Sequence, residues 1–175
     1  MKNICVFCGA SSGNDDKYIE LAATVGELLG QSGHRMIYGG GKVGLMGAAA
    51  DACLQSGGEV IGVIPKNLVS QEVAHFKVTL LHVVENMHER KKMMYDNSDA
   101  FLVLPGGMGT LDEMFEILTW AQLKLHNKPV YILNETGFFT HLIQYLQHAS
   151  DEGFIRKEHL QLFKVLTKVE DVKNL

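Results

Sequence analysis

The chain has 175 residues, of which 46% are hydrophobic and 21% charged, and these proportions are ordinary for a globular protein with one hydrophobic core. A formal net charge of −4 argues against a general nucleic-acid binder, because contacts to many phosphates require an excess of Lys and Arg. No apolar run approaches the ~20 residues that span a bilayer, and the N-terminus passes into a strand without an apolar signal region. We therefore expect one cytoplasmic domain, residues 1–175, with no membrane or nucleic-acid partner.

Apolar runs and amphipathic stretches alternate along the chain. In chain order they predict a strand at 2–8, a helix at 16–30, a strand at 35–38, a helix at 45–55, strands at 59–64 and 78–84, a helix at 86–97, a strand at 100–104, a helix at 110–125, a strand at 129–133, a helix at 137–150 and an edge strand at 163–166. The strands are near-continuous apolar runs, which is typical of strands buried on both faces. The alternation predicts an α/β fold, a doubly wound and mostly parallel sheet with helices on both faces.

Three glycine-rich turns follow predicted strands, at Gly9–Gly13, Gly39–Gly47 and Pro105–Gly109. Ligands of open α/β sheets bind outside the carboxyl ends of the strands. We therefore expect these turns to surround a binding site. The least periodic stretch, Pro65–His75, is expected to be a loop near the same end of the sheet.

The most informative turn reads Pro-Gly-Gly-Met-Gly-Thr-Leu-Asp-Glu over residues 105–113. A helix that opens at Thr110 after such a turn presents backbone N–H groups to a phosphate or another anion, and Glu113 in its first turn adds a carboxylate beside that site. Thr110 and Glu113 also have the Thr-x-x-Glu spacing of a capping box, which would give Glu113 a purely structural role. Leu111, Met114, Phe115 and Leu118 are expected to form the buried face of this helix.

A second candidate cluster lies in the helix that Asn86 is expected to cap. Arg90 and Lys91 share a helix face with the large apolar residues Met87 and Met94. These cations either snorkel to water or face a cleft, where a buried guanidinium needs a phosphate or carboxylate partner.

Other motifs favour simpler interpretations. Gly39, Gly41 and Gly44 fit G-x-G-x-x-G, but the motif follows the second strand, whereas a dinucleotide site has it after the first. Cys5 and Cys8 form C-x-x-C within a strand, without a second Cys or His pair at zinc spacing, so free buried thiols are expected. No metal signature, P-loop or nucleophile elbow is present, and no metal ion is expected.

Taken together, several stretches resemble one family. They are Cys8-Gly9-Ala10-Ser11-Ser12, Tyr38-Gly39-Gly40-Gly41 with Gly44-Leu45-Met46-Gly47, Met87-His88-Glu89-Arg90-Lys91, the 105–113 motif, and Thr119-Trp120 before Lys128-Pro129-Val130. The chain resembles the LOG (Lonely Guy) family of cytokinin riboside 5′-monophosphate phosphoribohydrolases from its first strand to about residue 133.

The resemblance implies a Rossmann-like fold, a homodimer with active sites near the interface, and no cofactor. It implies hydrolysis of the N-glycosidic bond of adenosine 5′-monophosphate-type nucleotides, which yields the free base and ribose 5-phosphate. Arg90 and Glu113 would be catalytic. The implied substrate-binding residues are Glu72, Lys91, Gly106, Gly107, Met108, Gly109, Thr110 and Thr119. Glu72 lies in surroundings that depart from the family pattern, and Met108 occupies a position that often holds an aromatic residue.

Other functions remain open at this point. Members of the family are often labelled lysine decarboxylases, but nothing in the sequence matches a pyridoxal phosphate lysine with its ring-nitrogen and phosphate partners. A nucleotide-binding sensor or carrier would use the same glycine turn, and a broader nucleoside 5′-monophosphate nucleosidase would use the same catalytic groups. The small-residue helix Leu45–Ala52 and the Trp120 region are either dimer interfaces or packed within the monomer.

Overall fold

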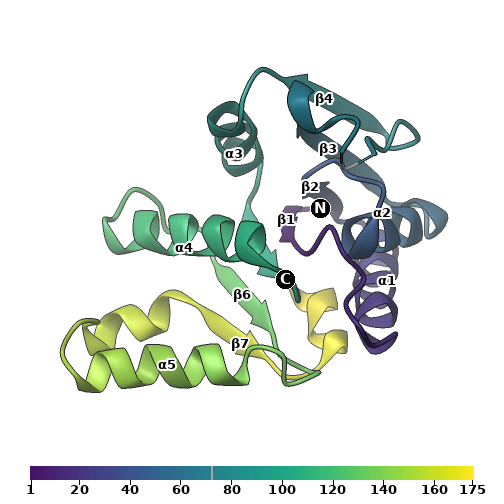
Figure 1. Cartoon of the computed structure of the whole chain (residues 1–175). Helices are drawn as coiled ribbons and strands as arrows, with labels where there is room; N and C mark the ends of the chain where they lie inside the picture. Colours follow the sequence, from purple (N-terminus) through teal and green to yellow (C-terminus); the bar gives the residue numbers. More distant parts are fainter. Residues whose placement is uncertain (72) are drawn as a thin grey trace.

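The fold is a seven-stranded parallel sheet flanked by helices (Figure 1). A computed structural model describes residues 1–71 and 73–175. The strands are β1 (Asn3–Phe7), β2 (Arg35–Tyr38), β3 (Glu59–Pro65), β4 (Leu80–Val84), β5 (Ala100–Val103), β6 (Val130–Leu133) and β7 (Lys164–Leu166). The helices are α1 (Lys17–Gln31), α2 (Gly44–Gln55), α3 (Met87–Asp96), α4 (Met108–Gln122) and α5 (Thr140–Asp151), and η1 (Lys66–Leu68), η2 (Lys157–Leu162) and η3 (Val169–Asn174) are short 3₁₀ helices.

The strand order is β4-β3-β2-β1-β5-β6-β7, and every neighbouring pair is parallel. The chain first builds outward from β1 to β4, and then returns to the other side of β1 with β5. This confirms the predicted doubly wound α/β fold and puts its switch point between β1 and β5, where ligands of such sheets bind. The loops after these two strands are joined there, because the Gly9 amide donates a hydrogen bond to the Pro105 carbonyl (3.0 Å).

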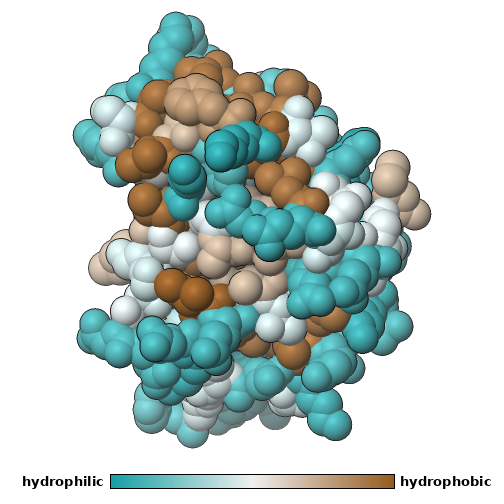
Figure 2. Space-filling view, turned by 90° about the vertical axis from the view of Figure 1, so that its right-hand side faces the viewer, coloured by the Kyte–Doolittle hydropathy of each residue, from teal (hydrophilic) through white to brown (hydrophobic). Residues whose placement is uncertain are grey.

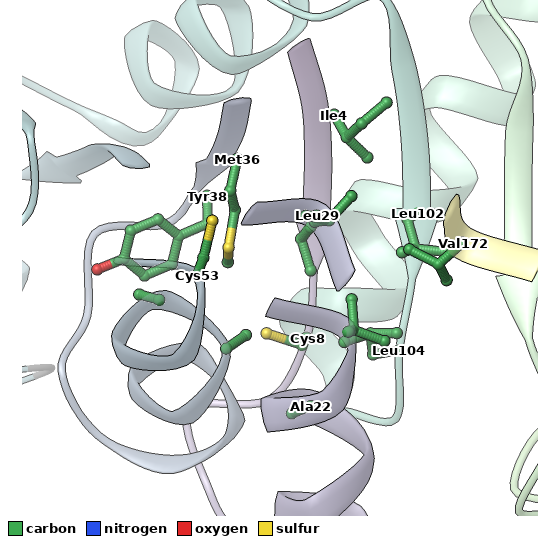
Figure 3. Packing of buried hydrophobic residues seen from close by; sticks show 14 of the residues in the cluster. Ile4, Cys8, Ala22, Leu29, Met36, Tyr38, Cys53, Leu102, Leu104 and Val172 are labelled. Carbon is green, nitrogen blue, oxygen red and sulfur yellow. The ribbon is translucent and has the colours of Figure 1, made fainter. Parts of the chain in front are cut away.

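Alternate residues of β1 enter different hydrophobic clusters. Ile4 and Val6 pack with α1 and α2, whereas Cys5 and Phe7 pack with α3, α4 and Phe139. Figure 3 shows the first cluster, in which Ile4 and Leu102 from neighbouring strands face the same layer as side chains of α1 and α2. Both faces of the sheet are therefore covered, as the continuous apolar strands predict.

The small residues of α2 serve packing within the monomer. A Cβ atom on Gly26 of α1 would lie 2.0 Å from the carbonyl oxygen of Ala49 in α2, so glycine allows the two backbones to touch. Ala49, Ala50 and Cys53 are buried in the same cluster. Of the two uses expected for Leu45–Ala52, the structure shows packing within the monomer.

Element boundaries differ from the prediction where turns intervene. The helix expected from Gly137 begins at Thr140, because Asn134 holds the preceding residues in a turn. Its carbonyl accepts from the Gly137 amide (3.0 Å), and its side chain accepts from the Phe139 amide (2.7 Å). Gly137 has φ +74°, which is incompatible with a right-handed helix.

The sheet has β4 and β7 as its edges, and the predicted edge strand near residue 163 is confirmed as β7. On the other wing, Leu80 and Val83 of β4 and Phe76 in the preceding loop are exposed. Figure 2 views the molecule from the right-hand side of Figure 1 and shows apolar side chains gathered in its upper part, the level at which Figure 1 labels β4. Helices therefore cover the faces of the sheet but leave this edge partly open.

Candidate active site

A cavity of about 480 Å³ opens at the switch point of the sheet. The loops after β1, β2 and β5 and the adjoining turns of α1, α2, α3 and α4 line it. Among the lining residues are Gly9, Gly39, Arg90, Gly106, Thr110 and Glu113. The three predicted glycine turns thus surround one cavity.

The turn after β5 has the shape of an anion cradle. A Cβ atom on Gly106 would lie 2.1 Å from the Thr110 hydroxyl oxygen, so glycine lets the turn fold back onto the helix. Gly107 and Gly109 line the cavity, and a Cβ atom on either would meet nothing within 4 Å. The first amides of a helix lack acceptors within it, and α4 has no acidic residue in its first turn. These amides and the positive end of the helix dipole favour a bound anion.

The capping-box interpretation of Glu113 is wrong. Helix α4 begins at Met108, two residues before the predicted start, and its N-cap is Gly107, which makes no side-chain cap hydrogen bond. Thr110 is the third helical residue, and Glu113 lies in the second turn, where it cannot complete a Thr-x-x-Glu box. Its carboxylate instead belongs to a half-buried side chain in the cavity wall.

Arg90 does not snorkel, because it is only 5% exposed. Asn86 caps α3 as predicted, since its side chain accepts from the Glu89 amide (3.0 Å). One turn on, Arg90 Nη2 donates to the carbonyl of Gly39 (2.8 Å). A Cβ atom at Gly39 would lie 2.0 Å from Nη2, so this glycine leaves space for the guanidinium. The Gly-Gly-Gly turn after β2 thus helps to hold a cation at the cavity.

The charge of Glu113 affects the buried thiols nearby. Burial raises the pKa of Cys8, and the negative charge of Glu113 raises it further. Burial, followed by Glu113, also raises the pKa of Cys5, while Arg90 lowers it by a smaller amount. All three cysteines are free and buried, as predicted. Cys8 is therefore a neutral part of the cavity wall.

Three of the predicted binding residues do not line this cavity. The Lys91 ammonium pairs with the carboxylates of Glu116 (2.5 Å) and Asp112 (3.2 Å) on α4, and the hydrogen bond that it donates to Glu116 raises its pKa most. Met108 is 85% exposed, and Thr119 is exposed further along α4. The fourth residue, Glu72, lies outside the described residues.

The buried face of α4 also differs from the prediction. Phe115 was expected in the core but is 36% exposed, and Ile117 is buried instead, beside Met114 and Leu118. Thr110, expected at the helix start, is part of this buried face. The helix is rotated so that Thr110 and Glu113 border the cavity, which carries Phe115 toward the surface.

The sequence prediction missed two aromatic lining residues, Tyr18 at the start of α1 and Phe138 before α5. No motif connects them, because they are 120 residues apart and meet only through the fold. Positive-φ glycines near each, Gly13 and Gly137, are the sole local sign of ordered turns there.

Within residues 1–71 and 73–175, no three His, Cys, Asp or Glu side chains cluster in a way that would hold a metal ion. None of the helices in this part of the chain combines the length and the apolar character that a membrane crossing requires.

Comparisons with known proteins agree on one family. A family described as "possible lysine decarboxylase" matches residues 46–175. The chain is 50% identical to the cytokinin riboside 5′-monophosphate phosphoribohydrolase of Rhodococcoides fascians, over 88% of this chain and 78% of that protein. It is 46% identical to the protein of the same name, LOG1, of Arabidopsis thaliana, over 88% of this chain and 72% of the relative.

Solved structures agree on the fold. The molybdenum cofactor carrier protein of Chlamydomonas reinhardtii has a TM-score of 0.68 at 21% identity, and covers 99% of this chain and 94% of its own. The molybdenum cofactor binding protein of Rippkaea orientalis has a TM-score of 0.69 at 20% identity, over 98% and 93% of the two chains. At such identities the likeness extends to the fold alone.

Proposed function

The chain belongs to the LOG family, and we propose that it is a phosphoribohydrolase that cleaves the N-glycosidic bond of cytokinin riboside 5′-monophosphates and of AMP. The products are the free base and ribose 5-phosphate. The names of relatives up to 50% identical support this reaction class. The site supports it with one observation, the presence of a glycine anion cradle, a buried arginine and a carboxylate in the same cavity.

The cradle would bind the 5′-phosphate. Amides at the start of α4 and the Thr110 hydroxyl would donate hydrogen bonds to its oxygens, and the open faces of Gly107 and Gly109 leave room for them. Arg90, fixed by Gly39, would supply a positive charge with little loss of side-chain entropy. Phosphate binding away from the reacting bond would then position the sugar for attack.

Glu113 would act at the anomeric carbon. Breaking the ribosyl–base bond builds positive charge on the sugar ring. A carboxylate next to C1′ stabilises that charge and can orient or deprotonate the attacking water. The half-buried position of Glu113 lowers the local dielectric and so strengthens this interaction, and the neutral thiol of Cys8, which also lines the cavity, adds no competing charge.

A homodimer would explain the binding residues that lie outside the cavity. Lys91, Met108 and Thr119 all lie on α3 or α4, and Phe115 of α4 and Leu123 directly after it are also exposed. A second copy of the chain packed against this surface would cover its apolar side chains and bring the polar ones to the interface. Phe115→Glu should then yield a monomer in sedimentation experiments, whereas an unchanged mass would exclude this surface as the interface.

Substitution of Glu113 by Gln tests the reaction. It keeps the shape of the side chain but removes the charge, so we expect adenine release from AMP to fall by at least ~10²-fold. The melting temperature should stay near that of the wild type, because Glu113 is not a helix cap. Glu152→Gln, at an exposed position after α5 and outside the cavity, is the matched control. Full turnover in Glu113→Gln would remove Glu113 from the mechanism.

The alternative functions share this site but differ in outcome. A sensor or carrier would bind AMP without releasing adenine, which chromatography of the reaction mixture detects directly. A broader nucleosidase would release bases from several purine and pyrimidine monophosphates at similar rates. A panel of nucleoside monophosphates therefore distinguishes all three.

A further inference from the structure

The cavity extends across the ends of several neighbouring strands. Arg90 is bonded to Gly39 directly after β2, whereas Phe138 follows β6, and β1 and β5 lie between these strands. With neighbouring strands ~4.8 Å apart, three spacings separate the two ends by roughly 14 Å. Figure 1 agrees, since α4 lies between α3, which carries Arg90, and α5, which follows Phe138. The cavity is thus an elongated site with two distinct ends.

The end away from Arg90 is aromatic. The rings of Tyr18 and Phe138 meet edge to face, with centroids 5.6 Å apart and planes at 80°. Both line the cavity, and Phe138 remains 41% exposed. A large ring exposed to solvent beside a cavity has a free-energy cost that a bound ligand would remove.

The chain holds these rings in place before any ligand binds. A Cβ atom at Gly13, which has φ +77°, would lie 2.9 Å from the Tyr18 ring, so glycine lets the loop pass close to the ring. Phe138 packs edge to face on the buried Phe139 (5.0 Å). The Asn134 side chain fixes the Phe139 amide. Such rigidity reduces the entropy lost on binding.

The two ends differ in charge as well as shape. Among the described residues that line the cavity, the charged ones are Arg90 and Glu113, and the geometry above puts Arg90 at the far end. An uncharged flat heterocycle therefore fits the aromatic end, while a ribose 5-phosphate fits the rest of the cavity, between the cradle after β5 and Arg90. Stacking on aromatic rings is tolerant of base identity but strengthens with the area of the ring system.

We propose that Tyr18 and Phe138 bind the nucleobase and make the enzyme favour purine over pyrimidine nucleotides. The proposal rests on the proposed function, because it assumes a nucleoside monophosphate as ligand. Both residues would contact the leaving base and set the specificity for it. Neither takes part in cleavage of the bond.

The test is Phe138→Ala, assayed with AMP, CMP and ribose 5-phosphate. Loss of one stacking partner should raise KM for AMP about 5- to 150-fold, with a smaller change in kcat. The preference for AMP over CMP in kcat/KM should shrink. Inhibition by ribose 5-phosphate, which has no base, should be unchanged. Tyr18→Leu should weaken AMP binding in the same way, and Tyr18→Phe should bind AMP with the affinity of the wild type.

Phe154→Ala is the matched control, because Phe154 is 89% exposed and outside the cavity. Equal losses for AMP and ribose 5-phosphate in Phe138→Ala would mean that the cavity has collapsed, and this would overturn the proposal. Unchanged AMP affinity and unchanged preference would overturn it too. If the wild type releases no base, the proposed function fails, and titration calorimetry with AMP and ribose 5-phosphate still tests the aromatic site.

Discussion

Replacement of Gly39 by Ala is expected to displace the Arg90 guanidinium although residue 90 itself is unchanged. The new Cβ would lie 2.0 Å from Arg90 Nη2, and an ordinary contact begins at 3.4 Å, so the guanidinium must move by roughly 1.4 Å. That shift breaks the 2.8 Å hydrogen bond to the Gly39 carbonyl. Loss of this charged hydrogen bond costs about 1.5–3 kcal/mol of the free energy of unfolding, and misplacement by ~1 Å costs about 10²-fold in rate.

Two assays separate these effects. Calorimetry should show a melting temperature ~5–10 °C lower, since 1 kcal/mol corresponds to about 2–4 °C at this chain length. Base release from AMP, measured well below that temperature, should fall about 10²-fold per folded molecule. Gly26→Ala is the control, because its Cβ would clash as closely with Ala49 but leaves Arg90 in place, so stability should fall while turnover is kept. Wild-type kcat/KM in a folded Gly39→Ala protein would refute the role given to Arg90.

Three further substitutions test other parts of the structure. Gly106→Ala should abolish ribose 5-phosphate binding in calorimetry and cost about 1–3 kcal/mol of stability, because its Cβ would lie 2.1 Å from the Thr110 hydroxyl; intact binding would mean that the cradle lies elsewhere. His75→Ala should lower the free energy of unfolding by about 1.5–3 kcal/mol in urea titrations, since the buried His75 bonds the Asp51 carboxylate at 2.9 Å; a change below ~0.5 kcal/mol would make the pair incidental. Burial raises the pKa of Cys53 to about 11, so the thiol stays neutral in the folded state, whereas it ionises near pH 8.5 in the unfolded state. As the pH rises from 7.5 to 9.5, the free energy of unfolding of the wild type should therefore fall by about 1.3 kcal/mol more than that of Cys53→Ala. Equal losses in the two proteins would contradict a buried neutral thiol.

The fold followed from local features of the sequence. Continuous apolar runs that alternate with amphipathic stretches have few solutions other than a parallel sheet with helices on both faces. Glycine turns directly after strands then fall at the carboxyl edge, and the cavity at Gly9, Gly39 and Gly106 lies there. Boundaries were less predictable, because a cap such as Gly107 or an Asn134 turn depends on hydrogen bonds that composition does not reveal.

The residues alone therefore determined the sheet, its layers and the edge at which the cavity opens, since periodicity and turn chemistry act over a few neighbouring residues. Only the tertiary structure decided that Arg90 is buried against Gly39, that Glu113 belongs to a cavity wall, and that Tyr18 meets Phe138. Each of these contacts joins segments that are far apart in sequence, and the strand order at the switch point brings them together. Local sequence patterns carry no information on contacts between distant segments, because the packing of the whole chain sets those contacts.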